Sequence, residues 1–247
     1  MLKPYEQKLQ SIKDEIQKVG VDVVDSLELC LKALKDNNIN DLKNIEITEK
    51  KLQIKSNEID NLIVTTLALY SPEATDLRQL VSFLKITNEL VRTGSNAKDF
   101  AKQFKKSFSE DLNTSTILEY AIPLLKSALL SLQTSISIID ETNSKHIEEK
   151  YHRVIVEESK TDDLYLMVEK NILKLISKNL DLSKEYFDIL SALRRLEKIA
   201  DRAVSIANLL QFAHLFPIKI ITITVLPFFY NLIILLFAHI FYQIYLI

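Results

Sequence analysis

Glycine and proline, the residues that most often interrupt regular structure, are scarce in this chain. Its 247 residues include two glycines and five prolines. Because a many-stranded sheet needs frequent turns, this scarcity argues against such a sheet and favours long helices. The chain also has a single cysteine, Cys30, so an intrachain disulfide is excluded, which suits a reducing cytoplasm.

The chain has no excess of positive charge. Its 31 basic and 33 acidic residues give a formal net charge of -2, so the basic surface typical of a nucleic-acid-binding protein is not expected. The first residues are polar and charged, and they predict no secretory signal. Charge then nearly disappears from residues 214–247, where Lys219 is the one charged side chain. The sequence therefore divides into a charged body and an apolar tail.

Apolar residues recur at helical spacing through most of the body and predict six long helices. We expect Asn40 to cap the second helix and the polar residues 107–113 to separate the third from the fourth. Short connections make neighbouring helices antiparallel. The predicted fold is all-α, with two tandem, similar three-helix bundles at 1–106 and 107–213 and an apolar tail at 214–247. The predicted helices cover residues 5–36, 40–70, 72–104, 115–140, 143–177 and 183–213.

An internal repeat supports this division. Residues 196–203 (LEKIADRA) have a weaker copy at 90–97 (LVRTGSNA), and residues 161–164 (TDDL) have one at 59–62 (IDNL). In each half the shorter motif precedes the longer one, and the two spacings differ by four residues that fall near a predicted turn, where insertions are tolerated. The two halves are therefore expected to be structural copies of one another.

The second half holds a candidate metal site. Glu197 and Asp201 are one helical turn apart and share a face, where two anions repel each other unless a cation lies between them. Asp162 and Glu158 form a similar pair on the preceding antiparallel helix. Carboxylate oxygens suit hard divalent ions and also iron. Four carboxylates from two helices would form a metal site, whereas the alternative is an ordinary solvated helix face.

The first half keeps only part of this pattern. Asp60 matches Asp162, with Ser56 one turn before it, but Val91 and Ser95 stand where the second half has its acidic pair. A site here would lack most of its anionic ligands. We therefore expect at most a weak site at Asp60 and no high-affinity metal in this half.

Two segments carry a resemblance to a known family. Residues 71–78 (SPEATDLR) resemble the SPxASDLR turn of the PhoU family of phosphate-signalling regulators, and residues 196–208 resemble its LERIGDxAxNIA segment. In the turn, the matching positions include Ser71, Pro72, Asp76 and Arg78. The resemblance covers about residues 1–212 in order, and it implies a fold of two similar three-helix bundles.

The resemblance also implies a function. PhoU-like proteins are cytoplasmic accessory proteins that act between the phosphate ABC transporter and a sensor histidine kinase, and negatively regulate the phosphate regulon. Members bind divalent or iron-type metal ions on acidic motifs and form dimers. We therefore expect a homodimeric regulator with these two partners and not an enzyme, since the chain shows no Gly-rich phosphate loop and no Ser/His/Asp or Cys/His arrangement.

The tail leaves alternatives open. Residues 228–247 form an apolar run of the length that crosses a bilayer, with aromatic residues at both ends. This run predicts a membrane anchor. The alternative is that the whole tail, residues 214–247, is the product of a shifted reading frame, because the composition changes abruptly near His214. Three rival interpretations of the whole chain remain: a tail-anchored helical adaptor without metal-dependent regulation, a helical metal-carboxylate enzyme, and a coiled-coil structural protein.

Overall fold

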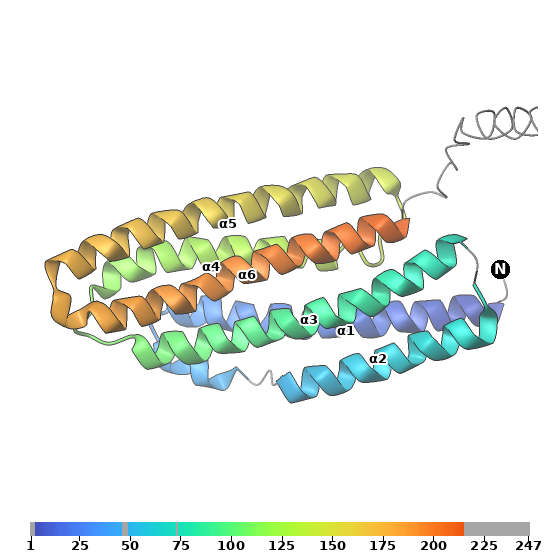
Figure 1. Cartoon of the computed structure of the whole chain (residues 1–247), viewed down its shortest axis with the longest axis horizontal. Coiled ribbons are helices and arrows are strands. Elements are labelled where there is room, and N and C mark those ends of the chain that lie inside the picture. The colour runs from blue at the N-terminus through green and yellow to red at the C-terminus, as the bar shows by residue number, and fades with distance from the viewer. Residues whose placement is uncertain (1–2, 46–48, 73, 215–247) are drawn as a thin grey trace, which may run out of the picture. The chain divides into compact units, whose positions relative to one another are not determined.

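The computed structural model describes residues 3–45, 49–72 and 74–214, and this part contains six α-helices and no strand (Figure 1). The all-helical fold class predicted from the sequence is confirmed. The tail hypotheses concern residues that lie, apart from His214, outside the described ranges. The helices are α1 (Lys3–Lys35), α2 (Glu49–Tyr70), α3 (Ala74–Ser107), α4 (Thr114–Ile136), α5 (Ser144–Lys178) and α6 (Ser183–His214), with 3-10 helices η1 (Ile39–Asn44) and η2 (Leu180–Leu182).

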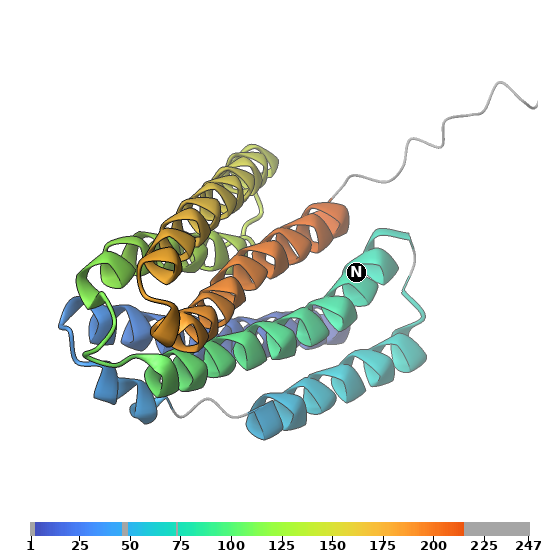
Figure 2. The ribbon, with the colours of Figure 1, turned by 60° about the vertical axis from the view of Figure 1, so that its left-hand side comes forward.

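Each half of the described chain contributes three neighbouring helices. Helices α1, α2 and α3 pack against one another, and so do α4, α5 and α6. The most extensive helix contact joins the two groups, because α3 lies alongside α6, as Figures 1 and 2 both show. Contacts between α1 and α4 extend this junction. The described helices therefore share one continuous core, while the division at residues 106 and 107 stays a prediction.

The apolar stripe of each helix faces this core. On α1, Ile12, Ile16 and Val23 are completely buried, as expected for residues on one face of a helix. Gly20 lies where α1 meets α4, and a Cβ atom added there would come within 2.7 Å of Ile136 Cδ1. Cys30 is also buried, and burial raises the pKa of its thiol to about 12. This cysteine therefore contributes packing rather than reactivity.

The predicted start of the second helix was wrong. Asn40 was expected to cap it, but Asn40 lies within η1, and α2 begins at Glu49. Asn37 takes a left-handed conformation with φ 52°, and the Asn38 N–H donates to the Ala33 carbonyl, which closes the end of α1. The chain then forms a short 3-10 helix because local polar groups compete with a regular helical start.

Other boundaries moved by a few residues. Helix α3 begins at Ala74 rather than at Pro72, and it continues past Phe104 to Ser107. Helix α4 ends at Ile136 rather than at 140, because the following turn is built from backbone bonds between residues three apart. In that turn the Ser137 hydroxyl donates to the Thr134 carbonyl over 2.8 Å, so a helix carbonyl is satisfied by a side chain.

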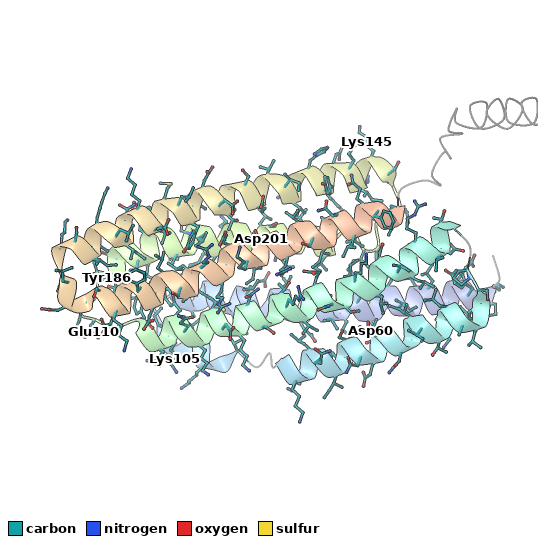
Figure 3. The ribbon with its side chains drawn as sticks, viewed as in Figure 1. Asp60, Lys105, Glu110, Lys145, Tyr186 and Asp201 are labelled. Carbon is teal, nitrogen blue, oxygen red and sulfur yellow. The ribbon has the colours of Figure 1, made fainter. Side chains whose placement is uncertain are left out.

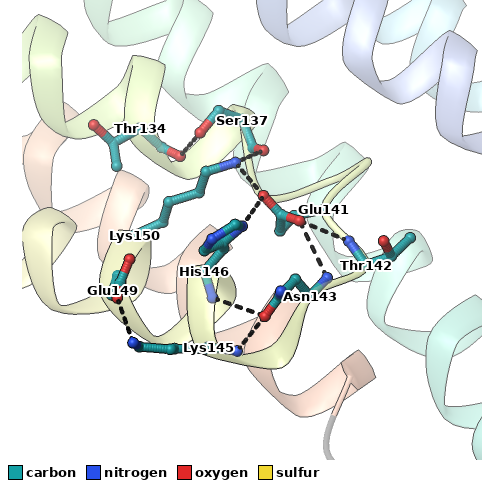
Figure 4. Close-up of polar contacts among 9 residues, drawn as sticks. All are labelled: Thr134, Ser137, Glu141, Thr142, Asn143, Lys145, His146, Glu149 and Lys150. Atoms are coloured by element: carbon teal, nitrogen blue, oxygen red, sulfur yellow. Dashed lines mark hydrogen bonds and ion pairs between the residues drawn. The ribbon is translucent and has the colours of Figure 1, made fainter.

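A polar cluster around Glu141 joins α4 to α5 (Figure 4). The Glu141 carboxylate accepts hydrogen bonds of 3.1 Å from the backbone N–H groups of Thr142 and Asn143. It also accepts a hydrogen bond of 3.0 Å from Lys150 Nζ. The hydrogen bond from Lys150, followed by the backbone bond from Asn143, lowers the pKa of Glu141 to about 2. Asn143 caps α5 by accepting from the Lys145 N–H.

Candidate metal centre

Three of the four predicted carboxylates meet between α5 and α6. Glu158 and Asp162 lie one turn apart on α5, and Asp201 lies on the antiparallel α6, where Figure 3 labels it. One carboxylate oxygen from each residue lies within 4.8 Å of the other two. Among the residues that the structure describes, this is the one group of three or more acidic, histidine or cysteine ligands so arranged.

The three carboxylates repel one another. Burial, followed by the charges of Asp162, Asp201 and Glu197, raises the pKa of Glu158. Burial and the charge of Asp201 likewise raise the pKa of Asp162. In addition, Asp162 Oδ1 is buried and has no hydrogen-bond partner among the described residues. A cation held between these groups would satisfy this oxygen and remove the repulsion.

Lys198 provides part of that positive charge. Its Nζ donates to Asp201 Oδ2 over 2.8 Å and lies 3.5 Å from Glu197 Oε1. The hydrogen bond to Asp201 is the largest of the effects that raise the pKa of Lys198. The sequence interpretation missed this residue, although it stands three positions before Asp201, a spacing at which helical side chains meet.

Glu197 lies beside the cluster and not in it. Its Oε2 atom is 3.6 Å from Arg194 Nε, as expected for an ion pair along one helix face. The same oxygen is buried and has no hydrogen-bond partner in the described part. Glu197 therefore adds a further negative charge beside the three-carboxylate group.

The first half has a different arrangement. Asp60 Oδ1 accepts a 2.7 Å hydrogen bond from the Thr87 hydroxyl, so a neutral donor satisfies this carboxylate. Val91 is buried, which leaves no room for a charge at its position. The nearby Glu89 turns toward the other half and pairs with Arg202 of α6, with Oε2 and Nη1 3.2 Å apart. Among the residues that the structure describes, Asp60 belongs to no group of three or more candidate metal ligands.

The turn motif connects helices. Ser71 has a φ of 43°, in the left-handed region, and its N–H donates to the Leu67 carbonyl at the end of α2. Pro72 then prevents the helix from continuing. Arg78 extends from α3 over the ring of Phe212 on α6, 5.2 Å from the ring centroid. Its guanidinium thus links the start of α3 to the end of α6 by a cation–π contact.

The charge of Asp76 acts on Tyr5, near the start of α1. It lies in the first turn of α3, where a negative charge is favourable. Burial, with a smaller effect of the Asp76 charge, raises the pKa of the Tyr5 hydroxyl to about 12. The Tyr5 ring in turn contacts Tyr70 edge-on, with centroids 5.7 Å apart. The motif residues therefore hold the α2–α3 turn against α1 and α6.

The chain has one glutamate–histidine pair at the spacing found in metal-carboxylate enzymes. Such enzymes usually pair a glutamate with a histidine three residues later on one helix. Glu149 and His152 have this spacing, but both are exposed, and His152 lies 3.8 Å from Glu148 in an ion-pair geometry. His152 is not part of the three-carboxylate group.

Membrane-spanning potential is confined to one described helix. Helix α4 (Thr114–Ile136) is long and apolar enough to cross a bilayer, but half of its most apolar segment is buried inside the bundle. A core helix of a water-soluble bundle has the same character.

These features define a class of protein: a duplicated six-helix bundle with a carboxylate cluster between its last two helices. The PhoU domain matches the chain twice, at residues 16–104 and 124–210, and the chain belongs to the PhoU family. The resemblance found in the sequence is thus confirmed.

Two relatives are each called "Phosphate-specific transport system accessory protein PhoU homolog". The protein of Clostridium acetobutylicum is 23% identical over 207 residues, covering 83% of this chain and 92% of its own. That of Xylella fastidiosa is 24% identical over 208 residues, covering 84% and 85%.

Two crystal structures share the fold. PhoU from Pseudomonas aeruginosa matches with a TM-score of 0.72 and 19% identity, over 85% of this chain and 98% of that one. The phosphate transport system regulatory protein PhoU from Streptococcus pneumoniae matches with a TM-score of 0.70 and 18% identity, over 87% and 100%. Their likeness is one of fold.

Proposed function

We propose that this protein is a cytoplasmic negative regulator of the phosphate regulon. It acts by contacts with the phosphate ABC transporter and its sensor histidine kinase, and it works as a homodimer without catalysing a reaction. The observation that carries the proposal is the double match to the PhoU domain, which spans most of the described helices. The relatives' role as accessory proteins of phosphate-specific transport supports the choice of partners.

Deletion of the gene tests this regulatory role. Genes induced by phosphate starvation should become active in phosphate-rich medium, and expression of the full chain from a plasmid should restore repression. Unchanged expression after deletion would contradict the proposal. Copurification of the chain with the transporter ATPase or with the kinase then measures each contact separately, and light scattering gives the oligomeric state.

The proposed regulator holds a divalent or iron-type ion at Glu158, Asp162 and Asp201. These residues fit such an ion because they offer only oxygen donors, and because Asp162 has a buried oxygen without a partner. Glu197 adds negative charge next to the ligands. The bound ion would act as a structural or sensing element by holding α5 to α6. Lys198 competes with it for Asp201.

Elemental analysis of the purified full chain tests the site. The variant Asp162→Asn/Asp201→Asn should lose the metal that the native protein retains after dialysis. The control Asp163→Asn/Asp181→Asn removes two exposed carboxylates, one on α5 and one on η2 just before α6, and should leave the metal content unchanged. Equal metal content in the native protein and the first variant would contradict the site, while the regulatory role would be judged by the deletion experiment alone.

A further inference from the structure

A hollow of about 300 Å³ lies between η1 and the second half of α3, far along the sequence from the carboxylate cluster. Figure 3 labels Lys105 on this part of α3, near η1. The floor of the hollow is apolar, since Leu42 and Ala101 are almost completely buried. Its volume is at the lower end of the range for small-ligand pockets. The described residues that line it are Leu42, Lys43, Ile45, Lys98, Ala101, Lys102 and Lys105.

The polar lining of this hollow carries charge of one sign. It contains four lysines and, among the described lining residues, no carboxylate. Lys98, Lys102 and Lys105 follow each other at spacings of four and three, so they share one face of α3, and Lys43 approaches from η1. None of the four makes an ion pair with another residue that the structure describes.

A purely structural role explains only part of this cluster. Lysines in the last turn of a helix interact favourably with the helix dipole, and Lys105 is in the last turn of α3. Lys98 and Lys102 lie earlier on α3, where the dipole effect has faded and where like charges one turn apart repel each other. An anion bound in the hollow would convert this repulsion into attraction.

A neighbouring hollow differs in charge. It has a volume of about 310 Å³ and shares Lys102, but it also contains Asp99 and Asp188 beside Lys106 and Arg195. Its mixed charge makes it a poorer anion site. Of these two hollows, the one at η1 is the more strongly cationic, and Lys102 lines both.

We infer that the hollow at η1 binds a linear oligophosphate anion. The ammonium groups are compact point charges, which suit phosphate oxygens. Lys98 and Lys105 are separated by about 10 Å along the helix axis at 1.5 Å per residue. Charges spread over this length match a chain of several phosphate groups better than a single phosphate ion. The described lining offers no aromatic ring on which a nucleotide base could stack. This inference does not depend on the proposed metal site.

Calorimetric titration of the full chain with inorganic tripolyphosphate tests the inference. Orthophosphate and sulfate are compared at equal ionic strength. Tripolyphosphate should bind at one site per chain and more tightly than either single anion. Its affinity should fall as salt is added, because Lys43 and Lys102 are exposed and salt screens exposed charges. The variant Lys98→Ala/Lys102→Ala/Lys105→Ala should weaken binding at least about tenfold.

Three controls make the result specific. The variant Lys170→Ala/Lys174→Ala/Lys178→Ala removes the same charge from an exposed face of α5 and should bind as the native chain does. The single variant Lys102→Glu should lose binding even if the triple variant unfolds in circular dichroism. Asp162→Asn/Asp201→Asn should still bind, which separates this site from tripolyphosphate held through a metal. Equal losses in the two lysine triples, or full affinity in Lys102→Glu, would overturn the inference.

Discussion

Lys198 Nζ donates a 2.8 Å hydrogen bond to Asp201 Oδ2, so the carboxylate cluster between α5 and α6 already contains one positive charge of the protein itself. The remaining repulsion falls on Glu158 and Asp162, whose pKa values are both raised. For the proposed metal ion to bind Asp201, the flexible side chain of Lys198 would have to move away from it. The proposed metal site therefore implies exchange between this internal cation and an external one.

Removal of the internal cation should have opposite effects on stability and on metal affinity. In chelator, Lys198→Ala should lower the free energy of unfolding by about 0.2–1 kcal/mol, the usual range for an exposed ion pair. Mn²⁺ should restore the loss and bind more tightly than to the native chain, because it no longer competes with the ammonium group. Urea unfolding with and without Mn²⁺ measures both effects. The exposed Lys174→Ala serves as control, and a Mn²⁺ response identical to that of the native protein would count against the exchange.

The contribution of Glu158 and Asp162 to the stability of the metal-free protein should decrease as pH rises through the acidic range. The folded state holds protons on Glu158 and Asp162 more tightly than the unfolded chain does, since their pKa values are raised. Stability from these groups is therefore present below the unfolded carboxyl pKa of about 4, and it is lost as pH rises through the folded values. Unfolding of the chelator-treated protein from pH 4 to 7, compared with Glu158→Gln/Asp162→Asn, isolates this contribution. The variant should lose less stability over the same range than the native chain; parallel curves would show that the two carboxyls do not contribute.

Glu141 should show the opposite dependence. Its pKa is lowered to about 2 in the folded state, chiefly by the hydrogen bond from Lys150. Its stabilising effect is therefore complete above the unfolded pKa and is lost as pH falls through about 2. Glu141→Gln should unfold at a lower temperature than the native chain at pH 7, and the difference should shrink below pH 4. The matched variant Glu148→Gln changes an exposed glutamate on α5 and should have little effect at either pH.

The pair formed by Glu89 and Arg202 should hold the two helical groups together. Its atoms Oε2 and Nη1 are 3.2 Å apart, and both side chains are mostly buried. Glu89→Gln leaves Arg202 without its partner and should reduce the free energy of unfolding by about 1–3 kcal/mol. A double-mutant cycle with Arg202→Met separates the pair from the individual side chains. A coupling energy near zero would mean that apolar packing alone joins α3 to α6.

Deletion of residues 215–247 should change the solubility of the protein. The removed segment is almost without charge and contains the twenty-residue apolar run. An exposed apolar segment of this size promotes association. The full chain should therefore aggregate or sediment with membranes, whereas residues 1–214 should remain in the soluble fraction. Detergent extraction of the full chain from membranes distinguishes an anchor from an aggregating tail, and equal insolubility of both forms would contradict the prediction.

The local sequence pattern was enough to predict the helices and to select the acidic residues of the candidate metal site. Apolar spacing predicted six helices, and the motif at residues 71–78 correctly predicted the turn between α2 and α3. Antiparallel neighbours explain why Glu158, Asp162 and Asp201 could be expected to meet. The 3-10 helix at Ile39–Asn44 was missed, because its hydrogen bonds depend on the conformation of single asparagine residues rather than on periodicity.

The sequence by itself determined the all-helical body, its duplication and the loss of the acidic pair at Val91 and Ser95, because side-chain chemistry and helical spacing act along one segment. Only the tertiary structure decided that Glu89 pairs with Arg202, that Lys198 enters the carboxylate cluster, and that four lysines from η1 and α3 surround one hollow. These relations depend on how helices distant in the sequence rotate and pack, and close packing of the whole core sets that rotation.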